Sequence, residues 1–306
     1  MILQQNLFSD EIEAQAIDRI VRFSKIAKSL GFDICVGFSG GKDSQVTYDL
    51  CKRAGIKFKA YYNVSFESNV TKKFIRENYP EVIWRKDHNF GFIENIKKNH
   101  EGLLPTVQMA YCCKDYKHNP RYADKCSVIG VRKSESKARE TRAAISIKNK
   151  TILKNNKELI TEYFVENCQN LGTKSVIQLL PIVDLTDKDV WNYINKYKLP
   201  INPEYLHSKR VGCMVCCKAN FTSNYYYLMK YPKLVDAFIL AHTNQKNDWI
   251  ITSENKDLTN DKVLYICRWL NHSFMPFSKK QQKLYEQFRK HYDAIYTSNT
   301  ILTIKN

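Results

Sequence analysis

The sequence predicts an α/β fold, in which a doubly wound and mostly parallel sheet is followed by a helical C-terminal extension. Short apolar runs of the kind that form buried strands alternate with amphipathic helical segments, which is the pattern of parallel sheets. A glycine-rich turn separates the first of these runs, residues 34–38, from the helix after it. Beyond residue 217 the sequence becomes aromatic, rich in Asn and Lys, and helical in its periodicity. These observations favour two domains, at residues 1–217 and 218–306.

The expected elements follow one another in a regular order. Residues 10–30 repeat their apolar positions with a helical period, and Gly31 ends that helix. Thr186 begins a capping segment for a helix at 190–197, with Pro200 beyond its end. Further strands are expected at 58–64, 82–84, 126–131 and 177–183, and further helices at 43–54, 67–79, 90–99, 225–241, 262–270 and 279–296.

The chain is strongly basic. Its 306 residues include 48 Lys and Arg against 31 Asp and Glu, which gives a formal net charge of +17. A hydrophobic content of 43% excludes a disordered chain, and the positive surplus attracts polyanions such as nucleotides or nucleic acid. No apolar run reaches the roughly 18–20 residues of a spanning helix, and the first residues do not resemble a signal peptide. We therefore expect a cytoplasmic protein with no membrane partner.

The most informative motif lies between the first strand and its helix, and reads Ser39-Gly40-Gly41-Lys42-Asp43-Ser44. Two glycines let the backbone approach an anion closely, and the following helix presents amide groups and its positive dipole end. The two serines supply hydroxyl donors and the lysine adds a charge, while Asp43 caps the helix or helps to hold Mg²⁺. An ordinary capped turn has the same composition. The position at the carboxyl end of a strand favours a phosphate-binding loop.

A second basic segment follows the strand expected at 126–131. Gly130 lies at the end of this strand, and Arg132, Lys133 and Arg139 gather just after it. Arginine suits tetrahedral oxyanions because its planar guanidinium donates two parallel hydrogen bonds. Glu135 is placed to orient one of the arginines or to help carry a metal ion. A solvated basic helix start is the alternative interpretation.

These motifs resemble those of the phosphoadenylyl-sulfate (PAPS) reductase family of the PP-loop ATP pyrophosphatase superfamily. The loop at 39–44 resembles the PP-loop, residues 130–139 resemble the second family signature, and residues 180–191 resemble the third. The resemblance implies an adenine nucleotide alpha-hydrolase-like fold and an enzyme of sulfur chemistry. It implies nucleotide binding by Ser39, Gly40, Gly41, Lys42, Asp43, Ser44, Gly130, Arg132, Lys133 and Glu135, and catalytic roles for Lys42, Arg132 and Arg139.

Five of the ten cysteines are grouped in two segments, as Cys112 and Cys113 and as Cys213, Cys216 and Cys217. A Cys-x-x-Cys segment suits zinc, a disulfide or an iron–sulfur cluster. An adjacent pair chelates a single ion poorly because the two side chains diverge, and binding two different irons of one cluster relieves this constraint. The scattered cysteines, Cys35, Cys51, Cys126, Cys168 and Cys267, are expected to be small buried hydrophobic residues.

The grouped cysteines are similar to the CC…CxxC ligands of assimilatory adenylyl-sulfate (APS) reductases. This resemblance implies a 4Fe–4S cluster held by Cys112, Cys113, Cys213 and Cys216, with Cys217 beside the motif. A zinc site, and redox-active or buried thiols, remain the alternatives.

The sequence departs from these reductases at the nucleophile. The reductases attack sulfur with a cysteine in a Glu-Cys-Gly-x-His segment, and this sequence contains no such segment. Cys267, in an amphipathic helical stretch, is expected to be packing. The complete Ser-Gly-Gly-Lys-Asp-Ser loop is more typical of relatives that use ATP, such as the sulfurylase small subunit and DNA phosphorothioation enzymes.

We therefore expect ATP, or APS or PAPS, as the substrate, with Mg²⁺ beside the phosphates. The expected reaction cleaves ATP between the α and β phosphates and adenylylates an acceptor for sulfur transfer. Expected partners are an adenine nucleotide, a nucleic acid acceptor, a sulfur donor or thioredoxin-like reductant, and a second copy or partner protein.

Two alternative functions stay open. One is a genuine APS or PAPS reductase that uses Cys267 or Cys217 as its nucleophile. The other is a regulator that binds nucleotide without turnover. Tyr225, Tyr226 and Tyr227, near Lys230, have the composition of a base-stacking surface and, equally, of a packed helix.

Overall fold

The computed structural model describes residues 2–86, 90–117, 125–147, 165–166, 177–243, 258 and 260–303. The chain forms two compact units that are not contiguous in sequence. Unit 1 contains Met1–Val64, Asn69–Lys86 and Tyr116–Gly212, and unit 2 contains Ser65–Ser68, Asp87–Asp115 and Cys213–Asn306. The domains expected at 1–217 and 218–306 stay a prediction, and the two units group the residues in a different way.

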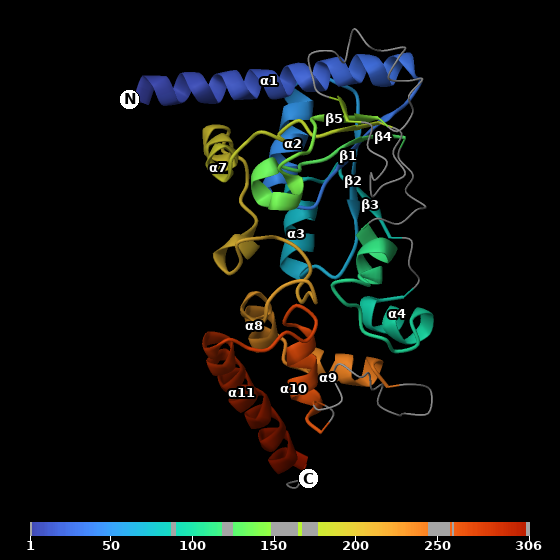
Figure 1. Cartoon of the computed structure of the whole chain (residues 1–306), viewed down its shortest axis with the longest axis vertical. Coiled ribbons are helices and arrows are strands. Elements are labelled where there is room, and N and C mark those ends of the chain that lie inside the picture. The colour runs from blue at the N-terminus through green and yellow to red at the C-terminus, as the bar shows by residue number, and fades with distance from the viewer. Residues whose placement is uncertain are drawn as a thin grey trace. The chain divides into compact units, whose positions relative to one another are not determined.

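Unit 1 contains the sheet and the helices around it (Figure 1). Its strands are β1 Ile34–Gly37, β2 Lys59–Asn63, β3 Ile83–Arg85, β4 Cys126–Val128, β5 Ile145–Ile147, β6 Val165–Glu166 and β7 Ile177–Leu179. Its α-helices are α1 Ile2–Ser29, α2 Lys42–Arg53, α3 Asn69–Asn78 and α7 Asp187–Lys196. Three short 3₁₀ turns, η2 Lys133–Glu135, η3 Lys137–Arg139 and η4 Pro203–Leu206, complete its described elements, and the π-helical turn η1 Cys113–Lys117 spans the boundary between the units.

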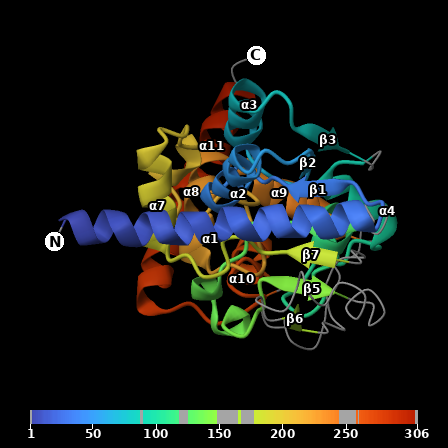
Figure 2. The ribbon, with the colours of Figure 1, turned by 90° about the horizontal axis from the view of Figure 1, so that it is seen from above.

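Within the described residues, seven strands form one sheet in the order β3-β2-β1-β4-β7-β5-β6. Figure 2 shows the labelled strands following one another in this order. The pairs among β1, β2, β3, β4 and β7 are all parallel, and β5 runs antiparallel to β7. The predicted α/β fold with a mostly parallel sheet is therefore confirmed. The chain builds outward from β1 to β3 and then continues with β4 on the other side of β1, so the strand order reverses at β1.

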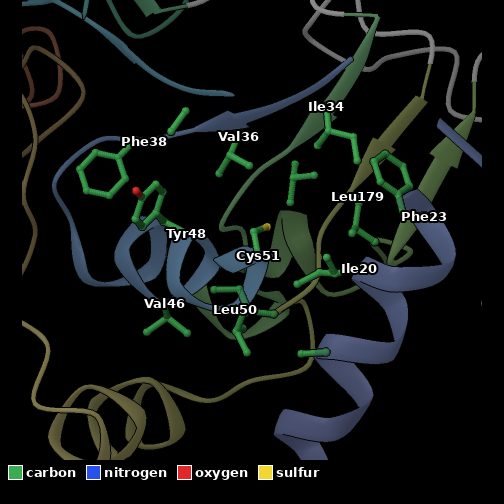
Figure 3. Packing of buried hydrophobic residues seen from close by; sticks show 14 of the residues in the cluster. Ile20, Phe23, Ile34, Val36, Phe38, Val46, Tyr48, Leu50, Cys51 and Leu179 are labelled. Carbon is green, nitrogen blue, oxygen red and sulfur yellow. The ribbon is translucent and has the colours of Figure 1, made fainter. Parts of the chain in front are cut away.

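The core of unit 1 forms where α1 and α2 pack beside the central strands. Figure 3 shows Ile20 and Phe23 of α1 close to Leu179 of β7, with Val36 of β1 and Leu50 of α2 in the same cluster. Val36 and Ile20 have no exposed surface. Ile34 and Val36 are buried while Cys35 and Gly37 are half-buried, so no position of β1 is fully exposed and its sequence is a continuous apolar run rather than an alternating one. This packing fixes the carboxyl end of β1, from which the glycine-rich loop departs.

Unit 2 is helical in its described part. Its helices are α4 Phe92–Asn99, α8 Phe221–Lys230, α9 Lys233–Ala241, α10 Lys262–Trp269 and α11 Lys279–Thr303. They surround a second hydrophobic core that includes Phe221, Phe238, Trp269 and Phe288. The helical C-terminal extension expected from the sequence is present, and Ile96 of α4 belongs to the same core.

The structure differs from the expected elements in two places. The helix expected at 225–241 is divided into α8 and α9, because Pro232 cannot continue a helix from Tyr231. Strands β5 and β6 were not expected, since they span three and two residues and carry little periodicity. No helix among the described residues is long and apolar enough to cross a lipid bilayer.

Candidate nucleotide-binding loop and cysteine group

The glycine-rich loop leaves the sheet at the point where the strand order reverses. It follows β1, which lies between β2 and β4, and leads directly into α2. Gly40 has a φ of +73°, and a Cβ on this residue would lie 3.0 Å from the side chain of Ile75. The left-handed conformation and the close approach of α3 together require glycine here. Open α/β sheets bind their ligands at this position, so the fold supports the predicted phosphate-binding loop.

Two serine hydroxyls close the loop. The Ser39 backbone N–H donates to Ser44 Oγ at 3.1 Å, and the two hydroxyl oxygens are also 3.1 Å apart. Ser44 in turn donates to the carbonyl oxygen of Gly41 at 2.8 Å. Ser44 is buried, whereas Ser39 is exposed at the surface of the loop. Ser44 therefore holds the shape of the loop, and Ser39 is the serine of the pair that is exposed to solvent.

The turn η4 supplies two contacts to the loop that the sequence did not suggest. Tyr205 accepts the backbone N–H of Lys42, the first residue of α2, with 2.8 Å between the hydroxyl oxygen and the nitrogen. Asn202, which has no exposed surface, donates its amide to the carbonyl oxygen of Gly40 at 3.0 Å. Burial raises the pKa of Tyr205 to about 12 in spite of the Lys42 amide, so this side chain is a neutral hydroxyl at pH 7.

The only sequence signals for these two contacts were local ones. Asn202 caps η4 by accepting the backbone N–H of Glu204, and Pro203 follows it at the first position of the turn. A cap of this kind predicts a turn but gives no information about what the turn packs against. The sequence indicated Pro200 and Pro203 only as residues beyond the end of the preceding helix.

Two charged residues of the loop form ion pairs with two charged residues that follow it in the sequence. We call this set the charge network: Lys42, Asp43, Arg132 and Asp187. The Arg132 guanidinium donates to Asp43 at 2.6 Å and to Asp187 at 3.0 Å. Lys42 Nζ lies 3.0 Å from Asp187 and 3.3 Å from Asp43. The network contains two cations and two carboxylates, so its formal charge is zero before any anion binds.

The members of the charge network differ in exposure. Arg132 is 3% exposed, while 64% of the Asp187 side chain is exposed. Burial alone would raise the pKa of Asp187, but the hydrogen bond from Lys42 and the charges of Lys42 and Arg132 outweigh it and hold the pKa below its ordinary value. Asp187 is therefore ionised at neutral pH and is the member that solvent reaches most easily. The sequence predicted a cap in this region but no role for Asp187 in the loop.

Gly130 permits the charge network to form, because it lets β4 and α2 approach closely. A Cβ on Gly130 would lie 2.5 Å from the carbonyl oxygen of Asp43 and 2.8 Å from Thr47 Oγ1. Such distances are shorter than any ordinary contact of a side-chain carbon. Two residues later, Arg132 reaches Asp43 from this close position. Gly130 therefore has a steric role that the sequence did not reveal, and its role in ligand binding stays a prediction.

Of the other predicted site residues, Lys133, Glu135 and Arg139 form two neighbouring pairs. Lys133 Nζ lies 2.8 Å from Asp184 at the surface. Glu135 accepts the backbone N–H of Arg132 at 2.9 Å and also pairs with Arg139. Glu135 thus contacts both predicted arginines. The ion pairs of Lys133 and Arg139 are with Asp184 and Glu135 rather than with residues 39–44.

The five grouped cysteines all lie in unit 2, and we call them the cysteine group. Cys112 interacts with Cys113 and with Cys217, and Cys217 interacts with Cys216. The hydrogen bond with Cys113, and after it the one with Cys217, lowers the pKa of Cys112. The same contacts raise the pKa of Cys113 and of Cys217. The two distant cysteine segments are therefore close in space. The structure brings Cys217, which the sequence assigned only a place beside the motif, into direct contact with Cys112.

The donor chemistry of the cysteine group fits an iron–sulfur cluster. Thiolates are the ligands of such clusters, and the cysteine group supplies five thiols from two segments. Among the described residues, no three His, Cys, Asp or Glu side chains lie close enough together to hold one metal ion. That finding concerns a single ion, whereas a 4Fe–4S cluster takes one thiolate at each iron. The assignment of Cys112, Cys113, Cys213 and Cys216 as ligands stays a prediction.

Among the described residues, three of the scattered cysteines and one of the three tyrosines are buried. Cys267 has no exposed surface, and burial raises the pKa of its thiol well above the ordinary value. Cys51 and Cys126 are fully buried, Cys35 is half-buried, and Cys168 lies outside the described residues. Tyr227 is buried in the core of unit 2, while Tyr225 and Tyr226 are half-buried.

Comparison with known proteins finds the same family that the motifs resemble. Residues 33–219 match the phosphoadenosine phosphosulfate reductase domain. An uncharacterized protein from Methanocaldococcus jannaschii is 24% identical over 294 residues, which cover 92% of this chain and 62% of that protein. An adenosine 5'-phosphosulfate reductase from Lysinibacillus sphaericus is 27% identical over 181 residues, which cover 58% of this chain and 59% of the reductase.

The chain thus spans about three fifths of the length of these two curated relatives. The crystal structure of a phosphoadenylyl-sulfate reductase from Candida auris, a phosphate complex, gives a TM-score of 0.39 and 15% identity, with 62% of this chain and 87% of that chain covered. The domain match extends over more than half of the sequence and contains the loop, Gly130, Arg132 and the grouped cysteines. This chain belongs to the phosphoadenosine phosphosulfate reductase family.

Proposed function

We propose that the protein binds ATP at the loop of residues 39–44 and cleaves it between the α and β phosphates, so that an acceptor is adenylylated for sulfur transfer. The observation that supports this most directly is the loop itself. Gly40 is in a left-handed conformation, Ser39 is exposed, and α2 begins at Lys42, at the reversal of strand order. An anion at this place meets the amides and the positive end of a 12-residue helix.

The proposed reaction is a nucleotidyl transfer. An acceptor oxygen attacks the α-phosphorus of ATP, the bond from this phosphorus to the bridging oxygen breaks, and pyrophosphate leaves with the bonding electrons. The acceptor loses its proton to solvent. Lys42 and Ser39 are placed to stabilise the charge on the leaving phosphates, while Arg132 keeps Asp43 and Asp187 in position. We assign the role of acceptor to a nucleic acid, on the basis of the net charge of +17.

Two further groups belong to the proposal. Asp43 and Asp187 are the carboxylates at the loop, and carboxylate oxygens are the ligands that Mg²⁺ prefers, so these residues would hold the ion that accompanies ATP. Cys112, Cys113, Cys213 and Cys216 would hold a 4Fe–4S cluster, which supplies a site for sulfur or electron chemistry when bound. Cys217 contacts Cys112 and is the fifth thiol available to this site.

The test is the release of pyrophosphate from ATP by anaerobically purified protein, with and without nucleic acid. The proposal predicts release that is lost in Lys42→Ala and Ser39→Ala. Lys57→Ala removes an equal charge from an exposed residue between α2 and β2, and it should leave release unchanged. Release that is equal in all four proteins would show that the loop does not catalyse the reaction.

A reductase is the second candidate, because one relative bears the name adenosine 5'-phosphosulfate reductase. Such a reaction needs an accessible thiolate to attack sulfur. Cys267 and Cys217 are 0% and 2% exposed, and the pKa of each thiol is raised, so neither is prepared for this role in the structure. Release of sulfite from adenylyl sulfate in the presence of thioredoxin would favour the reductase over ATP cleavage.

A further inference from the structure

The part of the chain that follows the matched domain makes direct contacts with both cysteine segments. The domain match ends at residue 219, and the relevant contacts come from Asn224 of α8 and from residues 269–273 at the end of α10. All of them lie within unit 2. One set of contacts is with the segment from Cys216 to Ala219. The other set is with Pro105 and Val107, in the segment that leads to Cys112.

The segment that carries Cys213, Cys216 and Cys217 is held mainly by Asn224. Its side-chain oxygen accepts the backbone N–H of Cys216 at 2.9 Å, and its amide donates to the Cys216 carbonyl oxygen at 3.0 Å. The same amide donates to the carbonyl oxygen of Leu270 at 2.8 Å. The backbone N–H of His272 donates to the carbonyl oxygen of Ala219 at 2.9 Å. Asn224 is 2% exposed, so these bonds are shielded from water.

The segment that leads to Cys112 is held by the same turn. Trp269 donates its indole N–H to the carbonyl oxygen of Pro105 at 2.6 Å, and Trp269 is 1% exposed. The backbone N–H of Val107 donates to Ser273 Oγ at 2.9 Å. One short stretch of chain therefore binds the backbone of both segments, which are about a hundred residues apart in the sequence.

This turn has an unusual backbone. His272, Ser273 and Phe274 have φ values of +49°, +56° and +76°, three consecutive residues in the left-handed region. For residues other than glycine, this region is strained. The hydrogen bonds of this turn to Ala219 and Val107 offset the strain. The hydrogen bond from the Phe274 backbone N–H to the carbonyl oxygen of Arg268 does so as well. The conformation places the Ser273 hydroxyl at Val107.

We infer that residues 269–273 and Asn224 form a clamp that sets the distance between the two cysteine segments, and that Ser273 and Trp269 are positioning residues of the cysteine site. The clamp consists of hydrogen bonds to backbone atoms on either side, so it defines the spacing of the thiols whichever group they bind. The inference does not depend on ATP cleavage. Its failure and the failure of the proposed reaction are separate results.

Phenylarsine oxide measures this spacing because its arsenic binds two nearby thiols. Two As–S bonds form, the arsenic-bound oxygen leaves as water with the two thiol protons, and no oxidation state changes. In the full chain with Cys112→Ser, Cys216→Ser and Cys217→Ser, one half-buried thiol remains on each segment, Cys113 on the first and Cys213 on the second. These two residues interact in the structure. Peptide mass mapping identifies the bridged pair, and titration gives its dissociation constant.

The decisive comparison is between Ser273→Gly and His272→Gly in this background. Both substitutions relieve left-handed strain, but only Ser273→Gly removes the acceptor for Val107. The clamp predicts that Ser273→Gly weakens the arsenical bridge about fivefold, the equivalent of one hydrogen bond of about 1 kcal/mol. His272→Gly, which keeps its backbone bond to Ala219, should bind as the parent does.

Trp269→Phe tests the second contact, because it keeps the ring packing and removes the bond to Pro105. It should weaken the bridge as Ser273→Gly does, with a cooperative unfolding transition retained. Equal affinities in Ser273→Gly and His272→Gly would overturn the inference. Failure of both Ser273→Gly and Trp269→Phe to fold would also overturn it, because the contacts would then serve stability rather than spacing.

Discussion

Arg132 shows how a residue expected to bind phosphate is used in the folded chain. It is 3% exposed, and its guanidinium donates to Asp43, Ser134 and Asp187. Each donation is directed at a protein oxygen, so the arginine organises the site before any ligand arrives. Asp187 is the exposed carboxylate of the charge network, and we expect it to be the member that an anionic ligand displaces or that a cation joins. The sequence singled out Arg132, but its partners lie on α2, η2 and α7, and only the fold brings them together.

The first prediction concerns Asp187→Asn. Removing this carboxylate changes the formal charge of the charge network from zero to +1, so pyrophosphate should bind about fivefold more tightly at low salt. Asp33→Asn changes the net charge equally at an exposed position before β1, and it should have little effect. Isothermal titration calorimetry measures both. Equal affinities in the two variants would show that Asp187 does not compete with the anion.

The same carboxylate gives a pH dependence. The pKa of Asp187 lies below its ordinary value of 3.8, so its ion pairs stabilise the folded state above that pH. Their contribution is lost as the pH falls through the lowered pKa. The stability difference between the protein and Asp187→Asn, less than about 1 kcal/mol because the pair is exposed, should be constant from pH 7 to 5 and close below 3.8. Urea unfolding at each pH tests this, and a difference that grows on acidification would contradict the assigned sign.

Gly130 gives a third residue-scale prediction. Gly130→Ala places a carbon 2.5 Å from the Asp43 carbonyl oxygen, so β4 and α2 must separate at a cost of about 1–3 kcal/mol. Gly212→Ala is the control, because no atom lies within 4 Å of the added carbon, and it should change stability by less than about 0.5 kcal/mol. The unfolding midpoint in urea gives both values. Similar midpoints would show that the two elements adjust easily.

At the scale of elements, the loop is shaped by neighbours from three places in the sequence. Ile75 of α3 approaches Gly40, Asn202 and Tyr205 of η4 bind the loop backbone, and Asp187 extends from the first turn of α7. The Thr186 hydroxyl accepts the Asp189 backbone N–H and fixes the start of that helix. The sequence predicted the helices of α3 and α7, the second from its capping segment at Thr186. It did not predict η4 against the loop, because that contact depends on how the chain returns to the sheet after α7.

Asn202→Asp tests the contribution of η4. The substitution keeps the acceptor for Glu204 but replaces the donor to the Gly40 carbonyl by a buried carboxylate. We expect a loss of about 2–4 kcal/mol in the free energy of unfolding. Asn195→Asp makes the same chemical change at an exposed position on α7 and should cost less than about 1 kcal/mol. Comparable losses in the two variants would mean that the bond to Gly40 contributes little.

At the scale of the whole molecule, the chain divides its chemistry between two units. The loop and the charge network lie in unit 1, and the cysteine group lies in unit 2. The parallel strands could be predicted because buried apolar runs are distinctive, and β4 and β7 were found at 126 and 177 where their runs begin. The division of the chain into two units could not be predicted, because residues 65–68 and 87–115 belong to unit 2 through tertiary contacts. The Ser65 hydroxyl, for example, lies 3.9 Å from Cys213 Sγ.

Iron loading tests the role assigned to unit 2. A cluster of about four irons on the grouped cysteines should slow amide exchange around α4, α8 and the segment that begins at Cys213, because binding favours the folded state. Exchange in β1, β2 and β4 should stay the same. Cys112→Ser with Cys216→Ser is the control without iron uptake. Protection that is equal in both units, or uptake by the control, would contradict the ligand assignment.

The central claim is that the loop of residues 39–44 directs cleavage of ATP at its α-phosphorus. The most direct measurement follows ATP labelled at that phosphorus in the presence of nucleic acid. We predict label in AMP or in an adenylylated acceptor, unlabelled pyrophosphate in equal amount, and loss of both in Lys42→Ala but not in Lys57→Ala. Label that stays in ATP, while adenylyl sulfate is reduced to sulfite, would contradict the claim and identify the protein as a reductase.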